Sequence, residues 1–363
     1  MYIKKIELLD FRNYESLELD LSDKTNILYG DNAQGKTNIL EATYISGTTK
    51  SHKGSHDKEV IKFDKDEAHI KTIVCKNEKD FQIDIHLRKN KTKGIAINRI
   101  PVKRASDLFG LLNIIFFSPE DLNIIKLGPS ERRRFMDIEL CQLDKIYLSD
   151  LTNYNKVLNQ RNKLLKDIIY NPSLKETLFV WDEKLVEYGK KIIKTRREFI
   201  NELNIIVKNI HNNITGGREN IELEYDPDIE DYLFFDELMK KKDTDLRYAQ
   251  TSVGPHRDDI KISVNGIDMR KFGSQGQQRT CALSMKLSEI KFVEDKIGEK
   301  PVLLLDDVFS ELDHNRQNFL LESLENIQTI ITCTGIDEFI NTRLHIDKVY
   351  EVSNGTVALK SQE

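Results

Sequence analysis

The sequence contains few cysteines, and none are spaced for metal binding. Its four cysteines, Cys75, Cys141, Cys281 and Cys333, include no C-x-x-C pair. Scattered cysteines of this kind argue against a zinc hook and are typical of reduced structural thiols. The cysteine pattern therefore indicates no structural metal.

Long apolar runs are also missing. Residues 1–6 lead directly into charged positions without the apolar segment of a secretory signal, and no later stretch approaches the ~20 apolar residues of a membrane helix. We therefore expect a cytoplasmic protein without a membrane partner. Its 363 residues are enough for two lobes, each with its own core.

The chain has no excess of positive charge. It carries 55 Lys and Arg against 60 Asp and Glu, a formal charge of −5. A general electrostatic attraction to DNA is thereby excluded, so any DNA binding must come from a local basic face.

The most informative segment that is present is residues 30–37, GDNAQGKT, which fits the phosphate-loop pattern G-x-x-x-x-G-K-[ST]. It follows an apolar run at 26–29 and precedes a helical pattern at 37–45, the expected strand–loop–helix context. Two glycines let the backbone turn its N–H groups toward phosphate, the lysine reaches the β- and γ-phosphates, and the threonine hydroxyl faces Mg²⁺. The residues predicted to bind ATP here are Gly30, Asp31, Asn32, Ala33, Gln34, Gly35, Lys36 and Thr37.

A second motif, residues 301–307 (PVLLLDD), is typical of a buried strand that ends in two carboxylates. We expect Asp306 to hold Mg²⁺ together with Thr37. Asp307, one residue further on, should point to the opposite face of the strand and orient the attacking water. With Lys36, these two carboxylates are the predicted catalytic residues. A core strand with solvated acids at its end is the simpler alternative.

A third motif, residues 272–279 (FGSQGQQR), is a glycine-containing loop that opens a helix. Ser274 and the N–H groups around Gly276 are predicted to contact a γ-phosphate. Because the phosphate loop already holds one nucleotide, this second anion site suits the nucleotide of a partner, which predicts a homodimer that encloses two ATP molecules. An ordinary capped helix is the alternative.

Together these motifs resemble an ABC-type ATPase head of the branch shared with SMC proteins, and within that branch the chain resembles the RecF family. Four further segments carry the family resemblance: residues 6–14 (IELLDFRNY), 117–122 (FSPEDL), 128–137 (GPSERRRFMD) and 252–259 (SVGPHRDD). The resemblance covers essentially the whole chain. It implies an α/β fold with a mixed β-sheet and a phosphate loop, plus a mainly helical second lobe.

The resemblance also implies a function. Members of the family bind ATP and DNA, dimerise with ATP and act with RecO and RecR in recombinational repair and replication-fork recovery, which supports a normal SOS response. We therefore expect a weak, DNA-stimulated ATPase with single-stranded or gapped DNA, or duplex junctions, as its partner. The family further implies that residues 310–313 meet the partner subunit. An ATP-gated clamp or scaffold in which hydrolysis is incidental is the alternative, and a transporter subunit would leave the RecF-like segments unexplained.

Three positions depart from the general ABC pattern. Asp307 stands where transport ATPases carry a longer Glu, so we expect slow hydrolysis. The usual switch histidine is missing, and Thr334 is the candidate sensor of the γ-phosphate. Residues 117–122 contain no glutamine that could approach the metal.

Two basic runs could contact DNA. Residues 88–104 contain no acid and surround a predicted hairpin turn at 90–94. A solvated hairpin tip explains them equally well, and the run Arg132, Arg133 and Arg134 could instead open a helix and pair with acids. The predicted DNA-contacting residues are Arg88, Lys89, Lys91, Lys93, Lys103 and Arg104.

The middle of the chain is strongly helical. Apolar residues recur at helical spacing over 143–168 and 178–210, which predicts two antiparallel helices joined at 171–173. We divide the chain into an ATPase part at 1–129, a helical lobe at 130–253 and a second ATPase part at 254–363, whose strand at 259–264 should rejoin the ATPase sheet. His256 beside Asp258 and Asp259 is explained more simply by a Gly-Pro turn than by a metal site.

Overall fold

The computed structural model describes residues 1–335 and 345–360, and these form two compact units. The first unit combines Met1–Asp121 with Glu289–Glu363, and the second is Leu122–Ser288. The helical unit therefore extends 35 residues beyond the expected boundary at residue 253, to Ser288, and begins at Leu122 instead of residue 130.

A mixed six-stranded sheet forms the centre of the first unit, in the order β15-β14-β3-β13-β12-β8. The strands from β14 to β8 are parallel, and only the edge strand β15 is antiparallel. Parallel neighbours place the carboxyl ends of β3, β12 and β13 at one edge of the sheet. The strands are β3 (Thr25–Tyr29), β8 (Ile114–Phe117), β12 (Val302–Asp306), β13 (Thr329–Cys333), β14 (Lys348–Ser353) and β15 (Thr356–Lys360).

A second, antiparallel sheet of the same unit has the order β2-β1-β4-β5-β6-β7. Buried and exposed residues alternate along β4, as expected for a sheet with one face toward the core and one toward water. Helix α1 (Lys36–Thr48) contacts strands of both sheets and is buried on nearly all sides. The strands are β1 (Tyr2–Phe11), β2 (Tyr14–Asp20), β4 (Glu67–Lys76), β5 (Lys79–Arg88), β6 (Gly94–Ile97) and β7 (Ile100–Pro101).

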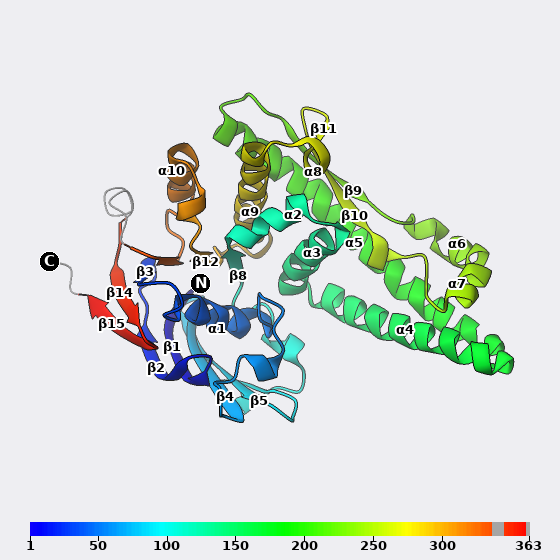
Figure 1. The fold of residues 1–363 in the computed structure, drawn as a ribbon, viewed down its shortest axis with the longest axis horizontal. Helices are drawn as coiled ribbons and strands as arrows, with labels where there is room; N and C mark the ends of the chain where they lie inside the picture. Colours follow the sequence, from blue (N-terminus) through cyan, green and yellow to red (C-terminus); the bar gives the residue numbers. More distant parts are fainter. Residues whose placement is uncertain (336–344, 361–363) are drawn as a thin grey trace. The chain divides into compact units, whose positions relative to one another are not determined.

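The second unit is built on a helical hairpin, drawn in green in Figure 1. Helix α4 (Lys145–Tyr170) packs against α5 (Leu178–Thr215), and the turn η4 (Pro172–Thr177) connects the two. The predicted pair of helices is thus confirmed. With 38 residues, α5 is about 57 Å long. The remaining helices of this unit are α2 (Asn123–Lys126), α3 (Pro129–Leu143), α6 (Phe234–Lys240), α7 (Lys242–Tyr248) and α8 (Met269–Phe272). Helix α9 (Gln275–Ile297) contains the boundary between the units at Ser288, and α10 (His314–Ser323) belongs to the first unit.

A separate three-stranded sheet in the second unit corrects one prediction. Strand β10 (Asp259–Val264) pairs with β9 (Ile221–Asp226) and with β11 (Ile267–Asp268), not with the ATPase sheet. The predicted turn at Asn265-Gly266 joins β10 to β11, and both of its residues have positive φ. Alternation correctly predicted a strand here, but it carries no information about which strands become its neighbours.

The short 3-10 turns complete the described chain. They are η1 (Asp57–Glu59), η2 (Ala105–Leu108), η3 (Pro119–Leu122), η5 (Asp231–Leu233), η6 (Pro255–Arg257) and η7 (Phe309–Glu311).

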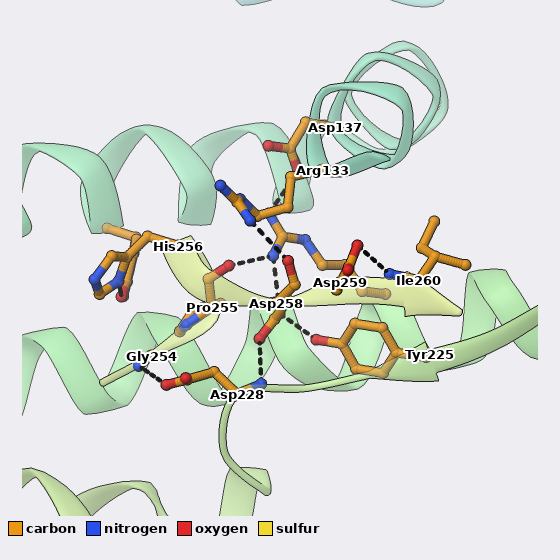
Figure 2. Close-up of polar contacts among 12 residues, drawn as sticks. Arg133, Asp137, Tyr225, Asp228, Gly254, Pro255, His256, Asp258, Asp259 and Ile260 are labelled. Carbon is orange, nitrogen blue, oxygen red and sulfur yellow. Dashed lines mark hydrogen bonds and ion pairs between the residues drawn. The ribbon is translucent and has the colours of Figure 1, made fainter. Parts of the chain in front are cut away.

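A buried ionic network joins the segments 128–137 and 252–259 within the second unit (Figure 2). Arg196 of α5 donates to Asp137 (2.8 Å), Asp258 (2.9 Å), the Pro255 carbonyl (2.6 Å) and the Tyr147 hydroxyl (3.0 Å). Burial alone would lower the pKa of Arg196, but the surrounding carboxylates raise it well above the usual value. The network therefore connects the long helix α5 with α3, with α4 and with the turn before β10.

The arginine run at the start of α3 belongs to the same structure. Arg132 is 3% exposed and pairs with Asp259, while Arg133 donates to the Asp258 carbonyl at 2.8 Å. The interpretation of this run as a helix start whose arginines pair with acids is thus confirmed for Arg132, and the acids lie more than a hundred residues away in sequence.

A second buried arginine ties three helices together. Arg161 of α4 pairs with Asp182 of α5 and Asp245 of α7, both at 2.7 Å, and none of the three side chains is more than 1% exposed. Burial raises the pKa of Asp182, and this effect is larger than the opposite effect of the neighbouring Arg161, which lowers the pKa.

Candidate functional site

The phosphate loop lies between β3 and α1, at the carboxyl edge of the mixed sheet. Gly30 and Gly35 have φ values of 152° and 115°, which favour glycine. A Cβ on Gly30 would lie 2.2 Å from the Val352 carbonyl oxygen, so close approach as well as backbone angle requires glycine. Lys36 is 8% exposed and donates to the backbone carbonyls of Gly30 and Asp31. The lysine is thus folded over its own loop, with its charge where phosphate oxygens are expected.

The turn after β1 supports this loop from one side. The Asn13 amide donates to the Gln34 carbonyl at 2.9 Å and accepts from Asn38 at 2.8 Å. Next to it, Arg12 makes two bonds of 2.8 Å to Glu41, a fully buried carboxylate of α1. Burial alone would raise the pKa of Glu41, but Arg12 and Ser51 lower it below the usual value.

The hairpin between β14 and β15 supports the loop from another side. The backbone N–H of Asn354 donates to the Gln34 side chain at 2.6 Å, and that of Gly355 to the Gln34 carbonyl at 3.4 Å. Gln34 is therefore held by segments from both ends of the sequence. Neither contact follows from the motif, because the motif specifies only the loop itself.

Asp306 ends β12 directly beside the loop. Its Oδ1 accepts from the Thr37 hydroxyl at 2.9 Å and from the Thr332 hydroxyl at 2.7 Å. A hydroxyl and a carboxylate at the mouth of a phosphate loop are the oxygen ligands that Mg²⁺ prefers. The structure thus brings together the two residues predicted to bind the metal.

Asp307 follows Asp306 directly, but its backbone differs from the extended strand conformation that the sequence predicted. It follows the end of β12 and has a φ of 54°, in the left-handed region, while its N–H donates to the Thr332 hydroxyl at 3.1 Å. The expectation that it points to the opposite face of a continuing strand is wrong, because the strand ends at Asp306. Both carboxylates line one cavity.

The cavity around these residues has a volume of about 440 Å³. Besides the predicted residues it is lined by His52 and Lys53 from the segment after α1, and by Ser118, Pro119 and Glu120 after β8. The His52 ring stacks on Phe116, with 3.9 Å between ring centroids. The sequence motifs do not predict these positions, although residues 117–122 belong to a segment that carries the family resemblance. Glu120 is the only acidic residue that this segment, as the structure describes it, contributes to the cavity lining.

Two residues predicted to contact a γ-phosphate, Thr334 and Ser274, do not line this cavity. Thr334 is exposed and is not among the residues that line the cavity, whereas Thr332, two residues earlier, is. In the second unit, Ser274 forms a capping box with Gln277: its hydroxyl accepts from the Gln277 N–H at 3.2 Å, and its N–H donates to the Gln277 side chain at 3.1 Å. The alternative of a capped helix is therefore present in the structure. The contact of Ser274 and Gly276 with a partner's nucleotide stays a prediction.

The basic hairpin β5–β6 forms as predicted, but several of its cations have partners. Lys89 pairs with Asp66 at 3.3 Å, Lys93 pairs with Asp57 at 2.9 Å, and Arg88 donates to the Thr92 carbonyl. Contact with DNA by the six basic residues of this region stays a prediction.

His256 has partners that explain it without a metal. It shares a hydrogen bond of 2.7 Å with the Tyr154 hydroxyl, and its second ring nitrogen lies 3.3 Å from the Thr251 carbonyl. Burial lowers its pKa to about 4. Figure 2 shows His256 turned away from Asp258, whose carboxylate is bound by Arg196 and Tyr225. The simpler interpretation of this segment holds.

A mixed sheet with a phosphate loop, a carboxylate pair at its edge and an adjoining antiparallel sheet together define a class, the ATPase head of ABC and SMC proteins. The sequence model of the family described as "RecF/RecN/SMC N terminal domain" matches residues 2–358. The head of an Smc protein bound to the C-terminal winged-helix domain of ScpA shares this fold, with a TM-score of 0.58 at 16% identity, covering 100% of this chain and 98% of that one.

More similar proteins narrow the class to one family. The "DNA replication and repair protein RecF" of Agathobacter rectalis is 66% identical over 98% of this chain and 99% of its own length, and that of Lachnospira eligens is 59% identical over the same shares. A solved structure described as "the recombination mediator protein RecF-ATP in RecFOR pathway" has a TM-score of 0.93 at 37% identity, covering 99% of this chain and 98% of that one. The chain belongs to the RecF family of DNA replication and repair proteins.

Among the described residues, no helix has both the length and the apolar character needed to cross a membrane.

Proposed function

We propose that this chain binds ATP with Mg²⁺ in the cavity of the first unit and uses it to join two copies of itself on DNA. The observation that carries the proposal is the bond of 2.9 Å between Thr37 and Asp306, beside a lysine held over its phosphate loop. A family member solved with ATP supports the choice of nucleotide.

The residues of the cavity have separate tasks. The backbone N–H groups of residues 32–37 and the Lys36 ammonium bind the β- and γ-phosphates. Thr37 and Asp306 would hold Mg²⁺, which neutralises charge on the phosphate oxygens when bound. Asp307 accepts a hydrogen bond from the attacking water and so orients it.

Turnover should be slow. Asp307 has a shorter side chain than the glutamate usual at this position, and its left-handed backbone fixes where the carboxylate can reach. Thr332 restricts the pair further, because its hydroxyl bonds both the Asp306 side chain and the Asp307 N–H. Hydrolysis then limits how long the dimer stays closed, because the dimer reopens once its ATP is hydrolysed. A low rate is sufficient for this role.

Ser274 and Gly276 would bind the γ-phosphate of the partner's ATP. Helix α9 begins at Gln275, so N–H groups at its start and its dipole favour an anion at Ser274. DNA, single-stranded, gapped or at a duplex junction, is the expected substrate of the closed dimer. RecR and RecO are the expected protein partners, because a family member is described as part of the RecFOR pathway.

The runner-up is a clamp or scaffold that ATP closes and in which hydrolysis plays no part. Asp307 supports the first proposal, since a pure clamp requires no second carboxylate in the cavity. The variant Asp307→Asn separates the two: it should trap an ATP-bound dimer that the unmodified chain only passes through.

The test is the molecular mass in solution without nucleotide, with ADP and with a non-hydrolysable ATP analogue, each with and without gapped DNA. We expect a dimer only with the analogue, and a tighter one with DNA. A mass that does not respond to nucleotide would refute the dimer mechanism. Lys36→Arg should keep part of the nucleotide affinity and lose hydrolysis, because a planar guanidinium cannot replace the compact ammonium.

The capping box makes a sharper variant possible. Ser274→Asp keeps a good N-cap for α9 but places a negative charge where the γ-phosphate is expected. We expect the helix content to be unchanged and the dimer to be lost. Ser149→Asp, at an exposed serine of α4, is the matched control and should dimerise normally. A Ser274→Asp variant that dimerises like the unmodified chain would show that Ser274 is only a cap.

A further inference from the structure

Two histidines and a glutamate meet on the solvent-facing side of the antiparallel sheet. His69 of β4 and His86 of β5 are direct partners in the strand register, and their rings stack with centroids 3.9 Å apart at 20°. Glu67 lies two residues before His69, on the same face of β4, and its Oε2 is 2.7 Å from His86 Nε2. Figure 1 shows the two strands that carry these residues.

The three side chains lie close enough to share one ion. One ligand atom from each lies within 4.8 Å of the other two. Zinc–nitrogen bonds of about 2.0–2.1 Å in a tetrahedron put ligand atoms roughly 3.3 Å apart. Closing the remaining distance requires rotation about side-chain bonds only, because the strand pairing already fixes the backbone on both sides.

The site is open to solvent and chemically suited to a transition metal. The side chains of Glu67 and His86 are 54% and 33% exposed, so an ion can enter without opening the core. Imidazole binds a metal ion in its neutral form, and each of the two rings offers a nitrogen to the group. Asp84, two residues before His86, adds negative charge nearby.

Basic residues near the site do not occupy it. Arg88 lies opposite Glu67 in the register, but its guanidinium donates to the Thr92 carbonyl at 2.9 Å. Lys71, the next outward residue of β4, is held by Glu7 at 3.0 Å. Neither of these two cations pairs with the Glu67 carboxylate, whose hydrogen-bond partner is His86.

We propose that Glu67, His69 and His86 form a zinc site on the outer face of this sheet, with a fourth position left to water. Two imidazoles and one carboxylate are a known ligand set for Zn²⁺, whereas Mg²⁺ prefers oxygen ligands alone. The site is therefore distinct in chemistry from the phosphate-loop cavity. Bound zinc would clip β4 to β5 and stabilise the folded first unit by mass action.

The experiment uses the full chain without nucleotide. Zn²⁺ affinity is measured by competition with a chromophoric chelator, and Co²⁺ is substituted to record its visible spectrum. We expect one equivalent of metal per chain and a Co²⁺ spectrum of a four-coordinate nitrogen and oxygen site. His69→Ala and His86→Ala should each weaken Zn²⁺ binding at least about tenfold, since each removes one of three ligands.

A matched control and two contrary results make the test decisive. His345→Ala removes a histidine that is 82% exposed and lies outside the group, and it should bind like the unmodified chain. Binding that survives both histidine variants would overturn the proposal. So would a Co²⁺–thiolate charge-transfer band, which would place the ion on a cysteine. Glu67→Gln, which keeps the size of the side chain, guards against loss of binding through misfolding: its circular dichroism should be unchanged while its affinity falls.

Discussion

Replacing Arg196 by methionine should destabilise the second unit strongly. The side chain is 2% exposed and donates four hydrogen bonds, two of them to the carboxylates of Asp137 and Asp258. Asp137 is 27% exposed and can turn to water, but Asp258 is fully buried and would be left without its cation. Breaking a buried ion pair from one side costs about 3–5 kcal/mol, so we expect a loss of that size in the free energy of unfolding.

The chain has a reporter in the same helix. Trp181 is its single tryptophan and lies in α5, so urea denaturation followed by tryptophan fluorescence measures the unfolding of the second unit. Lys191→Met, also in α5, is the control. The Lys191 side chain is 52% exposed and its ammonium pairs with Asp150 and Glu187 at 3.7 and 3.5 Å, so this substitution should cost less than about 1 kcal/mol.

The pH dependence gives an independent check on the cause. Burial raises the pKa of Asp258 even beside Arg196, and without the arginine it should rise further. A carboxyl group with a raised pKa in the folded state contributes stability below its unfolded pKa of about 3.9 and loses it as pH rises through the folded pKa. The deficit of Arg196→Met should therefore be smaller at about pH 5 than at about pH 8.

A second substitution tests the same reasoning. Asp258→Asn added to Arg196→Met removes the uncompensated charge and should recover part of the lost stability. A loss below about 1 kcal/mol for Arg196→Met, or a deficit that grows toward acid pH, would refute the idea that Asp258 depends on Arg196.

Three further predictions concern the nucleotide site and DNA. Gly35→Ala should weaken nucleotide binding about tenfold in a titration with a fluorescent ATP analogue, since its Cβ would lie 2.6 Å from the Asn13 amide at a φ of 115°; affinity equal to that of the unmodified chain would contradict the tight loop. Thr332→Val should slow ATP hydrolysis about tenfold in a phosphate-release assay with little change in nucleotide affinity; unchanged turnover would show that its hydroxyl does not position the carboxylates. Reversing Lys91 and Lys103 to Glu should reduce the salt dependence of binding to gapped DNA, by roughly one unit of the log–log slope for each lost contact; an unchanged slope would place the DNA face elsewhere.

Local patterns allowed much of this structure to be predicted from sequence. The phosphate loop, the run before Asp306 and the two long helices each depend on residues that are close neighbours in the chain. The side chain of Asp307 was placed wrongly because a continuing strand was assumed, whereas β12 ends at Asp306 and Asp307 has a left-handed backbone. The parts missed all depend on distant partners: Arg196 with Asp258, Gln34 with Asn354, and His52 in the cavity. Periodicity reports which face of a segment is apolar but not what covers it.

The same dependence on distant segments bears on how the chain is made. Strand β3, which leads into the phosphate loop, lies between β13 and β14, and these come from the last 35 residues of the chain. During synthesis β3 emerges early and remains without either neighbour until residues 329–353 have been made. The helical unit, by contrast, is one continuous stretch and can fold on the ribosome beforehand. A chain that stops before residue 329 would therefore contain a folded helical unit and an incomplete ATPase sheet. Such a truncated product should not bind nucleotide.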